Sequence, residues 1–206
     1  MNTDRTQSIL LKLLPLVAKQ GWTEHALQQA GQAAGETPQA MKILFPRGMT
    51  SAISAWQQML DAQTIQRIHI TGWQSERTRD KIAQGVWTRL ELVGEQRDAF
   101  QQATKQRLWR PATVMKDLWH SADALWTLAG DTATDYNRYT KRALLSKVLF
   151  KTTLSYMGDT SAGYQDTRNY LTQQIEQIIA AGQKLGTVKP VLNRIWSLAE
   201  KMGVRV

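Results

Sequence analysis

Apolar residues recur along this chain at the spacing of amphipathic helices, and the alternation typical of β-strands is not sustained anywhere in the sequence. The first such segment, residues 6–19, places its aliphatic side chains on one helix face: Ile9, Leu10, Leu13, Leu14 and Val17. Further helices are predicted at 24–30, from Pro38, at 49–60, after Ser75, at 98–107, at 111–128, and after Gly130 and Gly158. The pattern therefore predicts an all-α protein, a bundle of packed helices.

The three helices within residues 1–48 have the outline of a helix-turn-helix unit. A DNA-reading third helix presents Arg, Lys, Asn or Gln to base edges, yet the stretch TPQAMKIL offers only Gln39 and Lys42. Two interpretations stay open, a DNA-binding module and a three-helix packing unit that contacts no DNA. The scarcity of base-reading side chains favours the second.

The helix after Ser75 combines an apolar face with a charged one. Ile82, Val86, Trp87, Leu90 and Val93 repeat at helical spacing and should point inward. The opposite face carries Arg77, Arg79, Lys81 and Arg89 among three carboxylates, and we expect this face to be solvated.

A stripe of large side chains follows Pro111. Met115, Trp119, Ala122 and Trp126 share one helix face, in a chain with eight tryptophans. Such a stripe is typical of a core, because large aromatic rings fill the space between helices. It can also line an apolar ligand cavity, which is where ligands sit in helical bundles. The pattern favours a core and leaves the cavity as the alternative.

The last 23 residues, 184–206, combine a polar hinge with an amphipathic segment, VLNRIWSLAEKMGVRV. One face of that segment is apolar: Val191, Leu192, Ile195, Leu198, Ala199 and Met202, bordered by Trp196. A hinged helix of this kind with basic flanks can lie in a membrane interface. It could equally dock on its own domain or on a dimer mate, because both arrangements use the same stripe.

These features divide the chain into a helix-turn-helix-like module (1–48), a larger helical domain (49–183), and a hinge with an amphipathic helix (184–206). The net charge of +9 splits over them as +2, +3 and +4. Basic surface attracts nucleic acid and anionic lipid alike, so the charge alone does not name the partner.

Residues that carry catalytic chemistry are scarce. The chain has no cysteine and hence no disulfide or thiol chemistry, and His25, His69 and His120 lack metal-ligand neighbours at helical spacing. Metalloprotease, phosphate-loop and serine-hydrolase motifs are missing, and no apolar run approaches the roughly 20 residues that span a bilayer. We therefore expect a soluble binding protein without catalytic residues, metal or cofactor.

The stretch GDTATDYNRYTKRALL is polar where a core-forming helix would be aliphatic. Asp135, Tyr139 and Arg142 recur at i, i+4 and i+7 and share a helix face. A tyrosine flanked by opposite charges is typical of an interface hot spot. The alternative is an internal network, in which Asp135 caps the helix and Arg142 pairs with a carboxylate such as Asp159.

This stretch and the downstream GDTSAGYQDT resemble the signature region of the Coq-nine family of ubiquinone-biosynthesis accessory proteins. The residues that match the family pattern are Asp131, Thr132, Thr134, Asp135, Tyr136, Asn137, Tyr139, Thr140, Lys141, Arg142, Asp159, Asp166 and Thr167. GWTEHAL, LFPRG and RTRDKIAQGVWTRLE resemble other parts of the family, so the likeness covers nearly the whole chain.

The resemblance implies a TetR-like fold, a homodimer and an internal pocket for isoprenoid lipid. It also implies association with the hydroxylase that converts demethoxyubiquinone, and membrane contact through the C-terminal helix. The expected function is non-enzymatic: presenting isoprenoid quinone intermediates to that hydroxylase, from the cytoplasm at the inner face of the cytoplasmic membrane. A TetR-type DNA-binding transcription regulator with a hydrophobic ligand is the alternative.

Three sets of site residues follow from combining the resemblance with helical spacing. The partner-binding set is Asp135, Asn137, Arg138, Tyr139, Lys141 and Arg142. The lipid-binding set is Trp87, Leu90, Met115, Trp119, Ala122, Trp126, Leu145, Val148 and Leu149. The membrane set is Val191, Leu192, Ile195, Trp196, Leu198 and Met202. Arg138 departs from the family, in which many members carry tryptophan at this position.

Overall fold

The computed structural model describes residues 2–107, 109–132 and 136–178, and every regular element in these ranges is helical. This confirms the all-α class. The helices are α1 (Asn2–Gln20), α2 (Glu24–Ala33), α3 (Pro38–Leu44), α4 (Met49–Thr71), α5 (Thr78–Glu95), α6 (Arg97–Arg107), α7 (Pro111–Leu128) and α8 (Tyr136–Gly158). A 3-10 turn (Ala162–Tyr164) and a last helix over 165–178 follow. The predicted membrane set lies outside the described residues.

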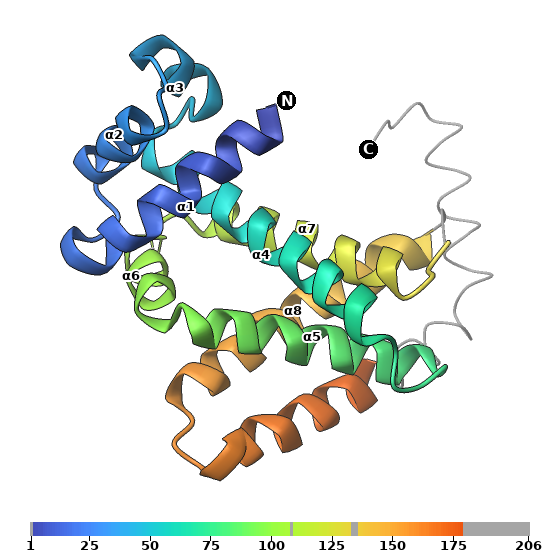
Figure 1. The fold of residues 1–206 in the computed structure, drawn as a ribbon. Helices are drawn as coiled ribbons and strands as arrows, with labels where there is room; N and C mark the ends of the chain where they lie inside the picture. Colours follow the sequence, from blue (N-terminus) through green and yellow to red (C-terminus); the bar gives the residue numbers. More distant parts are fainter. Residues whose placement is uncertain (1, 108, 133–135, 179–206) are drawn as a thin grey trace.

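Helices α1, α2 and α3 gather at one end of the molecule (Figure 1). The caps are the expected ones: the Thr23 hydroxyl accepts from the Ala26 amide at 3.1 Å, and Thr37 accepts from Ala40 at 3.2 Å. Trp22 and Trp56 pack with their ring centroids 5.1 Å apart in the core beneath this end. Burial of these two indoles joins the N-terminal helices to α4.

Helix α4 extends 11 residues beyond the predicted end at Leu60, to Thr71. The apolar pattern stops at Asp61, which suggested a boundary, yet Thr64 and Ile68 continue the buried face. Asp61 is tolerated inside because two groups hydrogen-bond to its carboxylate. Arg89 donates through Nε at 2.8 Å, and the Ser121 hydroxyl donates at 2.8 Å. One carboxylate thereby ties α4 to α5 and α7.

The predicted solvated face of α5 is wrong at Arg89, which is 3% exposed. Its guanidinium also donates to the Gln57 side-chain oxygen at 2.7 Å, so the charge is paired and hydrogen-bonded within the bundle. Burial raises the pKa of Asp61, and the nearby guanidinium opposes that rise. The physical reason for the error is that charge density along a helix does not show which cation has a buried partner.

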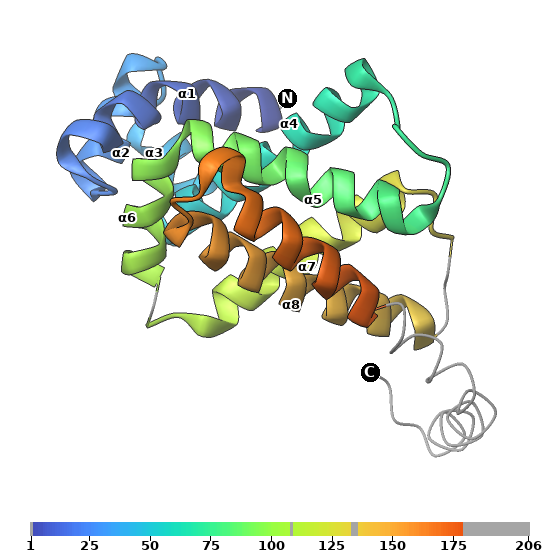
Figure 2. The same cartoon turned by 90° about the horizontal axis from the view of Figure 1, so that it is seen from below.

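A second core lies between α5, α7, α8 and the last helix. Figure 2 shows the last helix running across the bundle. Leu171 and Ile175 of the last helix are buried in this core, whereas Leu154 of α8 is half exposed. The chain reverses between α8 and the last helix through a left-handed pair, Gly163 at φ +64° and Tyr164 at φ +56°. The Tyr164 ring packs on Tyr156 with centroids 4.5 Å apart, which offsets the strain of the turn.

Candidate functional site

Arg142 is the centre of an ion-pair cluster at the α7–α8 junction. Its side chain is 2% exposed and donates to Asp123 of α7 through Nε and to Asp131 through Nη1 at 2.9 Å. Lys141 donates to the other oxygen of Asp131 at 2.6 Å. We name Asp123, Asp131, Lys141 and Arg142 the junction cluster.

The junction cluster leaves an exposed edge on the first turns of α8. Arg138 reaches Asp123 at 3.2 Å but is largely solvated, and the Tyr139 ring is 52% exposed. Arg138, Tyr139 and the half-exposed Lys141 are thus accessible, whereas Arg142 is not. The side chains of the other two residues of the partner-binding set, Asp135 and Asn137, lie outside the described part of the chain.

Asp159 is not the partner of Arg142 but caps the last helix. Its carboxylate accepts hydrogen bonds from the backbone amides and the hydroxyls of Ser161 and Thr167, at 2.6 to 2.8 Å. These hydrogen bonds hold the pKa of Asp159 far below its usual range. In the stretch GDTSAGYQDT, Asp159, Ser161 and Thr167 therefore stabilise the turn before the last helix.

Opposing effects act on the Asp131 carboxyl in the junction cluster. Burial raises its pKa, but hydrogen bonds from Lys141 and Arg142 outweigh burial and hold the pKa below the ordinary value. Lys141 and Arg142 were predicted as site residues, whereas no pairing role was predicted for Asp123 and Asp131. The mainly apolar sequence of α7 holds two carboxylates, Asp117 and Asp123, and this was the signal that could have identified Asp123.

The lipid-binding set separates into packed and outward-facing residues. Its core members contact one another and surrounding apolar groups: Leu90, Ala122, Trp126, Leu145, Val148 and Leu149. Met115 is 53% exposed and Trp119 is partly exposed, so these two do not face the core. The stripe on α7 thus packs in the core only in its second half, at Ala122 and Trp126.

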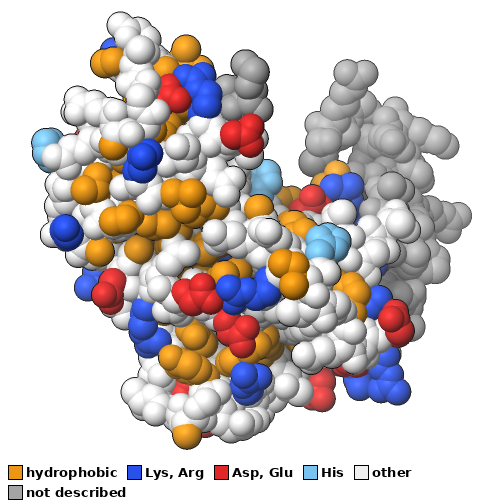
Figure 3. Space-filling view, viewed as in Figure 1, with side chains coloured by type: hydrophobic (Ala, Val, Ile, Leu, Met, Phe, Trp, Pro, Cys, Tyr) orange, Lys and Arg blue, Asp and Glu red, His pale blue; other side chains and the backbone are white. Residues whose placement is uncertain are grey.

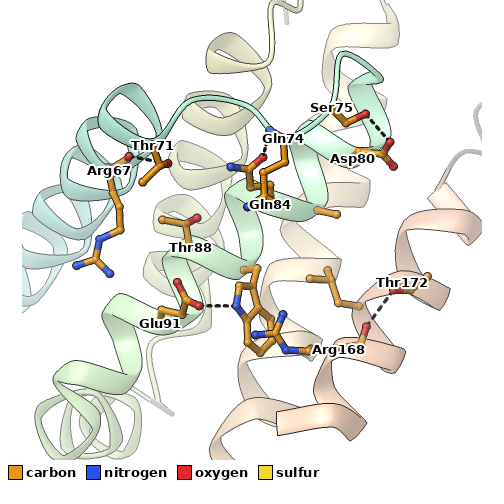
Figure 4. Close-up of a pocket in the computed structure, with 13 residues that line it drawn as sticks. Arg67, Thr71, Gln74, Ser75, Asp80, Gln84, Thr88, Glu91, Arg168 and Thr172 are labelled. Atoms are coloured by element: carbon orange, nitrogen blue, oxygen red, sulfur yellow. Dashed lines mark hydrogen bonds between the residues drawn. The ribbon is translucent and has the colours of Figure 1, made fainter. Parts of the chain in front are cut away.

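Trp87, the remaining member of that set, borders a groove of about 650 Å³ between the end of α4, α5 and the last helix (Figure 4). Its indole donates to Glu91 at 2.6 Å, and the Arg168 guanidinium lies 3.7 Å from the ring centroid. Most other residues along the groove are polar, among them Arg67, Gln74 and Gln84. Polar side chains thus border the groove around three apolar ones, Ala83, Trp87 and Leu171.

The surface of α3 offers little for DNA. Gln39 and Lys42 are exposed, but the neighbouring Ile43 is 74% exposed, where a base-reading helix would place a polar group. Figure 3 shows acidic, basic and apolar side chains intermixed on the face seen there. That face lacks the single-sign basic stripe that phosphate contacts require.

The described ranges contain neither a metal-binding cluster nor a membrane-spanning helix. There, no three His, Asp or Glu side chains gather closely enough to hold a metal ion. No helix in this part of the chain is both long and apolar enough to cross a bilayer.

Comparison with known proteins decides the family. The COQ9 family model matches residues 112–182, which contain the junction cluster. The Schizosaccharomyces pombe protein named "Ubiquinone biosynthesis protein coq9, mitochondrial" is 30% identical over 174 residues, covering 82% of this chain and 67% of that protein. The chain belongs to the COQ9 family. The resemblance seen in the sequence is thereby confirmed.

Mammalian COQ9 proteins are similar over a longer stretch. The human protein is 26% identical over 192 residues, which is 88% of this chain and 59% of the human one. The rat protein is 27% identical over 192 residues, with 88% and 61% covered. The chain therefore spans about three fifths of the length of these COQ9 relatives.

The comparison corrects the expected localisation. We expected a cytoplasmic protein at the inner face of the cytoplasmic membrane. The human, rat, bovine and yeast COQ9 proteins are all named mitochondrial, which points to mitochondria instead. Composition could not have shown this, because the charge and hydropathy that predict solubility are shared by proteins of both compartments.

Proposed function

We propose that this chain is a non-enzymatic, lipid-binding accessory protein of ubiquinone biosynthesis. The observation that carries the proposal is its similarity to COQ9 proteins over 88% of its length, all of them named for ubiquinone biosynthesis. In this role the chain presents an isoprenoid quinone intermediate to the demethoxyubiquinone hydroxylase.

The exposed edge beside the junction cluster is the proposed docking surface for that hydroxylase. Tyr139 supplies apolar area, and Arg138 and Lys141 supply charge around it. The buried Arg142 contributes by holding α8 against α7. A docking surface on a helix fixed in this way loses little conformational freedom on binding.

Two parts of the proposal concern assembly. The proposed arrangement is TetR-like, with domain boundaries at residues 48 and 183, and it implies a homodimer. Light scattering on the purified chain would test this by measuring the molecular mass in solution. The segment 184–206 is proposed to bind an anionic membrane surface. Truncation after Gly182 should then abolish sedimentation with anionic vesicles, and unchanged sedimentation would contradict this role.

The quinone profile of cells lacking the gene is the deciding experiment. Accumulation of demethoxyubiquinone with a fall in ubiquinone, reversed by the intact gene, is the expected result. An unchanged profile would refute the pathway role. DNA binding by α1–α3 would then be the next property to measure, by the salt dependence of the affinity.

A further inference from the structure

A groove of about 530 Å³ lies between the first half of α1, α4 with the turn before it, and the middle of α7. Its volume is in the range of pockets that hold small organic molecules. None of the residues that line it belongs to the partner-binding set or to the lipid-binding set. A ligand of this groove would therefore bind apart from the proposed hydroxylase docking surface and from the second core.

The groove offers amide groups that the protein does not use itself. Three exposed glutamines line it, Gln7 of α1 and Gln58 and Gln66 of α4. Within the described residues, none of these three side chains has a hydrogen-bond partner in the protein. A carboxamide donates two hydrogen bonds and also accepts them, so these side chains suit a ligand that carries several hydroxyl groups.

Two cations that line the groove have no carboxylate partner. Arg47, which follows α3, and Lys116 of α7 are exposed, and neither forms an ion pair within the described chain. Of the described residues that line the groove, Asp117 is the one acid, and its carboxylate is already engaged. It pairs with the buried Arg107 and accepts a hydrogen bond from the Ser54 hydroxyl at 3.0 Å. The groove therefore keeps an excess of positive charge, which attracts an anion.

The two cations come from separate elements, and this arrangement suits a phosphate ester. Arginine binds two phosphate oxygens through its planar guanidinium, and lysine binds phosphate as a compact point charge. A phosphate group has enough oxygens to accept from both side chains at once. The charge of the groove therefore favours a phosphate next to the hydroxyl groups that the amides would bind.

The described lining of the groove argues against a nucleobase. It contains no Trp, Tyr or Phe, and His120 is its one aromatic side chain. Sites for unpaired bases usually stack the base on an aromatic ring. The amides are therefore better matched to the hydroxyl groups of a sugar or polyol than to a base.

We propose that this groove binds a hydroxyl-bearing phosphate ester, with Arg47 and Lys116 on the phosphate and the glutamine amides on the hydroxyl groups. Free sugar or polyol phosphates carry this chemistry, and so does the head group of an inositol phospholipid. The inference goes beyond the proposed function and does not rest on it, because a quinone intermediate carries no phosphate.

The first test compares three soluble probes on the purified full chain by titration calorimetry. The compound myo-inositol 1-phosphate carries both phosphate and hydroxyl groups, myo-inositol lacks the phosphate, and inorganic phosphate lacks the hydroxyl groups. We expect myo-inositol 1-phosphate to bind at least tenfold more tightly than either of the others. Absence of its binding, or equal affinity for inorganic phosphate, would overturn the proposal.

Two substitutions test the cations. Arg47→Gln and Lys116→Gln each remove one charge from an exposed side chain, so neither opens the core. Each should weaken binding of myo-inositol 1-phosphate about tenfold, the effect of losing one charge-assisted hydrogen bond. Lys147→Gln, at an exposed lysine of α8 outside the groove, is the matched control and should bind like the unaltered chain.

A third substitution tests the space. Ala62 of α4 is exposed and lines the groove, so Ala62→Trp fills the groove without disturbing buried packing and should weaken binding at least tenfold. Ala143→Trp, at an exposed alanine of α8, is its matched control. If neither the charge variants nor Ala62→Trp weaken binding, the ester binds elsewhere and the assignment fails. Thermal unfolding of each variant shows whether a loss of binding reflects a loss of structure.

Competition experiments then separate the sources of the ligand. Displacement of bound myo-inositol 1-phosphate by vesicles of phosphatidylinositol, but not of phosphatidylcholine, would assign the groove to a lipid head group. Absence of displacement would assign it to a free ester, and both results agree with the proposal. Displacement by duplex DNA at a lower concentration than by unlabelled ester would make the groove a nucleic-acid surface and overturn the proposal. The quinone profile of cells tests the pathway role independently of all these results.

Discussion

The Tyr139 ring of α8 lies against the Trp119 ring of α7, with centroids 6.1 Å apart and planes inclined by 34°. Both rings are partly exposed, and the pair stands beside the junction cluster that fixes the start of α8. Trp119 thereby holds Tyr139 in a defined position at the surface. A half-exposed aromatic ring that is held in one position is typical of a hot-spot residue in an unbound interface.

Removal of this ring should weaken binding of the hydroxylase without unfolding the chain. Tyr139→Ala is expected to reduce the affinity about 30-fold, the effect of losing a hot-spot side chain. Its free energy of unfolding should change by less than about 1 kcal/mol, because the ring is half exposed. Titration of the purified hydroxylase into each variant measures the affinity, and urea unfolding measures the free energy of unfolding.

Two controls make that result specific. Tyr139→Phe keeps the ring and should bind nearly as well as the unaltered chain. Ile70→Ala removes another exposed apolar side chain, on α4, and should have no effect. Binding that survives Tyr139→Ala would place the docking surface elsewhere.

Arg142 should matter for stability far more than the exposed Arg138. Arg142→Met leaves Asp123 without its buried partner and leaves Asp131 with Lys141 alone. The expected loss is about 2–4 kcal/mol in the free energy of unfolding. Arg138→Met removes a solvated ion pair and should cost under about 1 kcal/mol. Equal urea midpoints for the two variants would contradict the central place of Arg142.

Gly94 of α5 leaves room for the Tyr156 side chain of α8. A methyl group added there would lie 3.2 Å from two ring carbons of Tyr156 and closer still to its hydroxyl. Gly94→Ala should therefore push α8 away and destabilise the chain by about 1–3 kcal/mol. Gly158→Ala meets nothing within 4 Å and is the matched control. Thermal unfolding of both variants distinguishes a steric effect from a general effect of glycine replacement.

Acid should weaken the corner that precedes the last helix. The pKa of Asp159 is lowered by its hydrogen bonds, so its stabilising effect is complete above the unfolded value of about 3.9 and disappears as the pH falls through the lower folded value. Asp159→Asn should melt at a lower temperature than the unaltered chain at pH 7. The difference should shrink steadily between about pH 4 and pH 2, and a difference independent of pH would refute the assignment.

Helix positions followed closely from the sequence, because caps and apolar spacing are local signals. Thr37 with Pro38 and the run from Pro111 to Leu128 set their helices at the predicted residues. Where a buried polar residue interrupted the apolar face, the prediction failed: Asp61 hid the continuation of α4, and Arg89 was placed in solvent. Both errors have one cause, since the partner that makes each charge tolerable is distant in sequence.

The candidate site was predictable only in part for the same reason. The residues that matched the family motif pointed to α8, but motif matches do not show which side chains reach the surface. Pairing with Asp123 and Asp131 turned Arg142 inward and left Tyr139 outward.

The contact between Asp131 and Lys141 also sets a limit on the length of the segment between them. Asp131 is hydrogen-bonded to Arg142 as well, so both ends of this stretch are anchored by side chains on opposite sides of the helix junction. An insertion or deletion within this segment would have to leave the positions of its two ends unchanged. Otherwise the Asp131 carboxylate would lose its contacts with Lys141 and Arg142. Relatives that keep these three charged residues should accordingly keep the spacing between them, and length variation should concentrate in other connections of the fold.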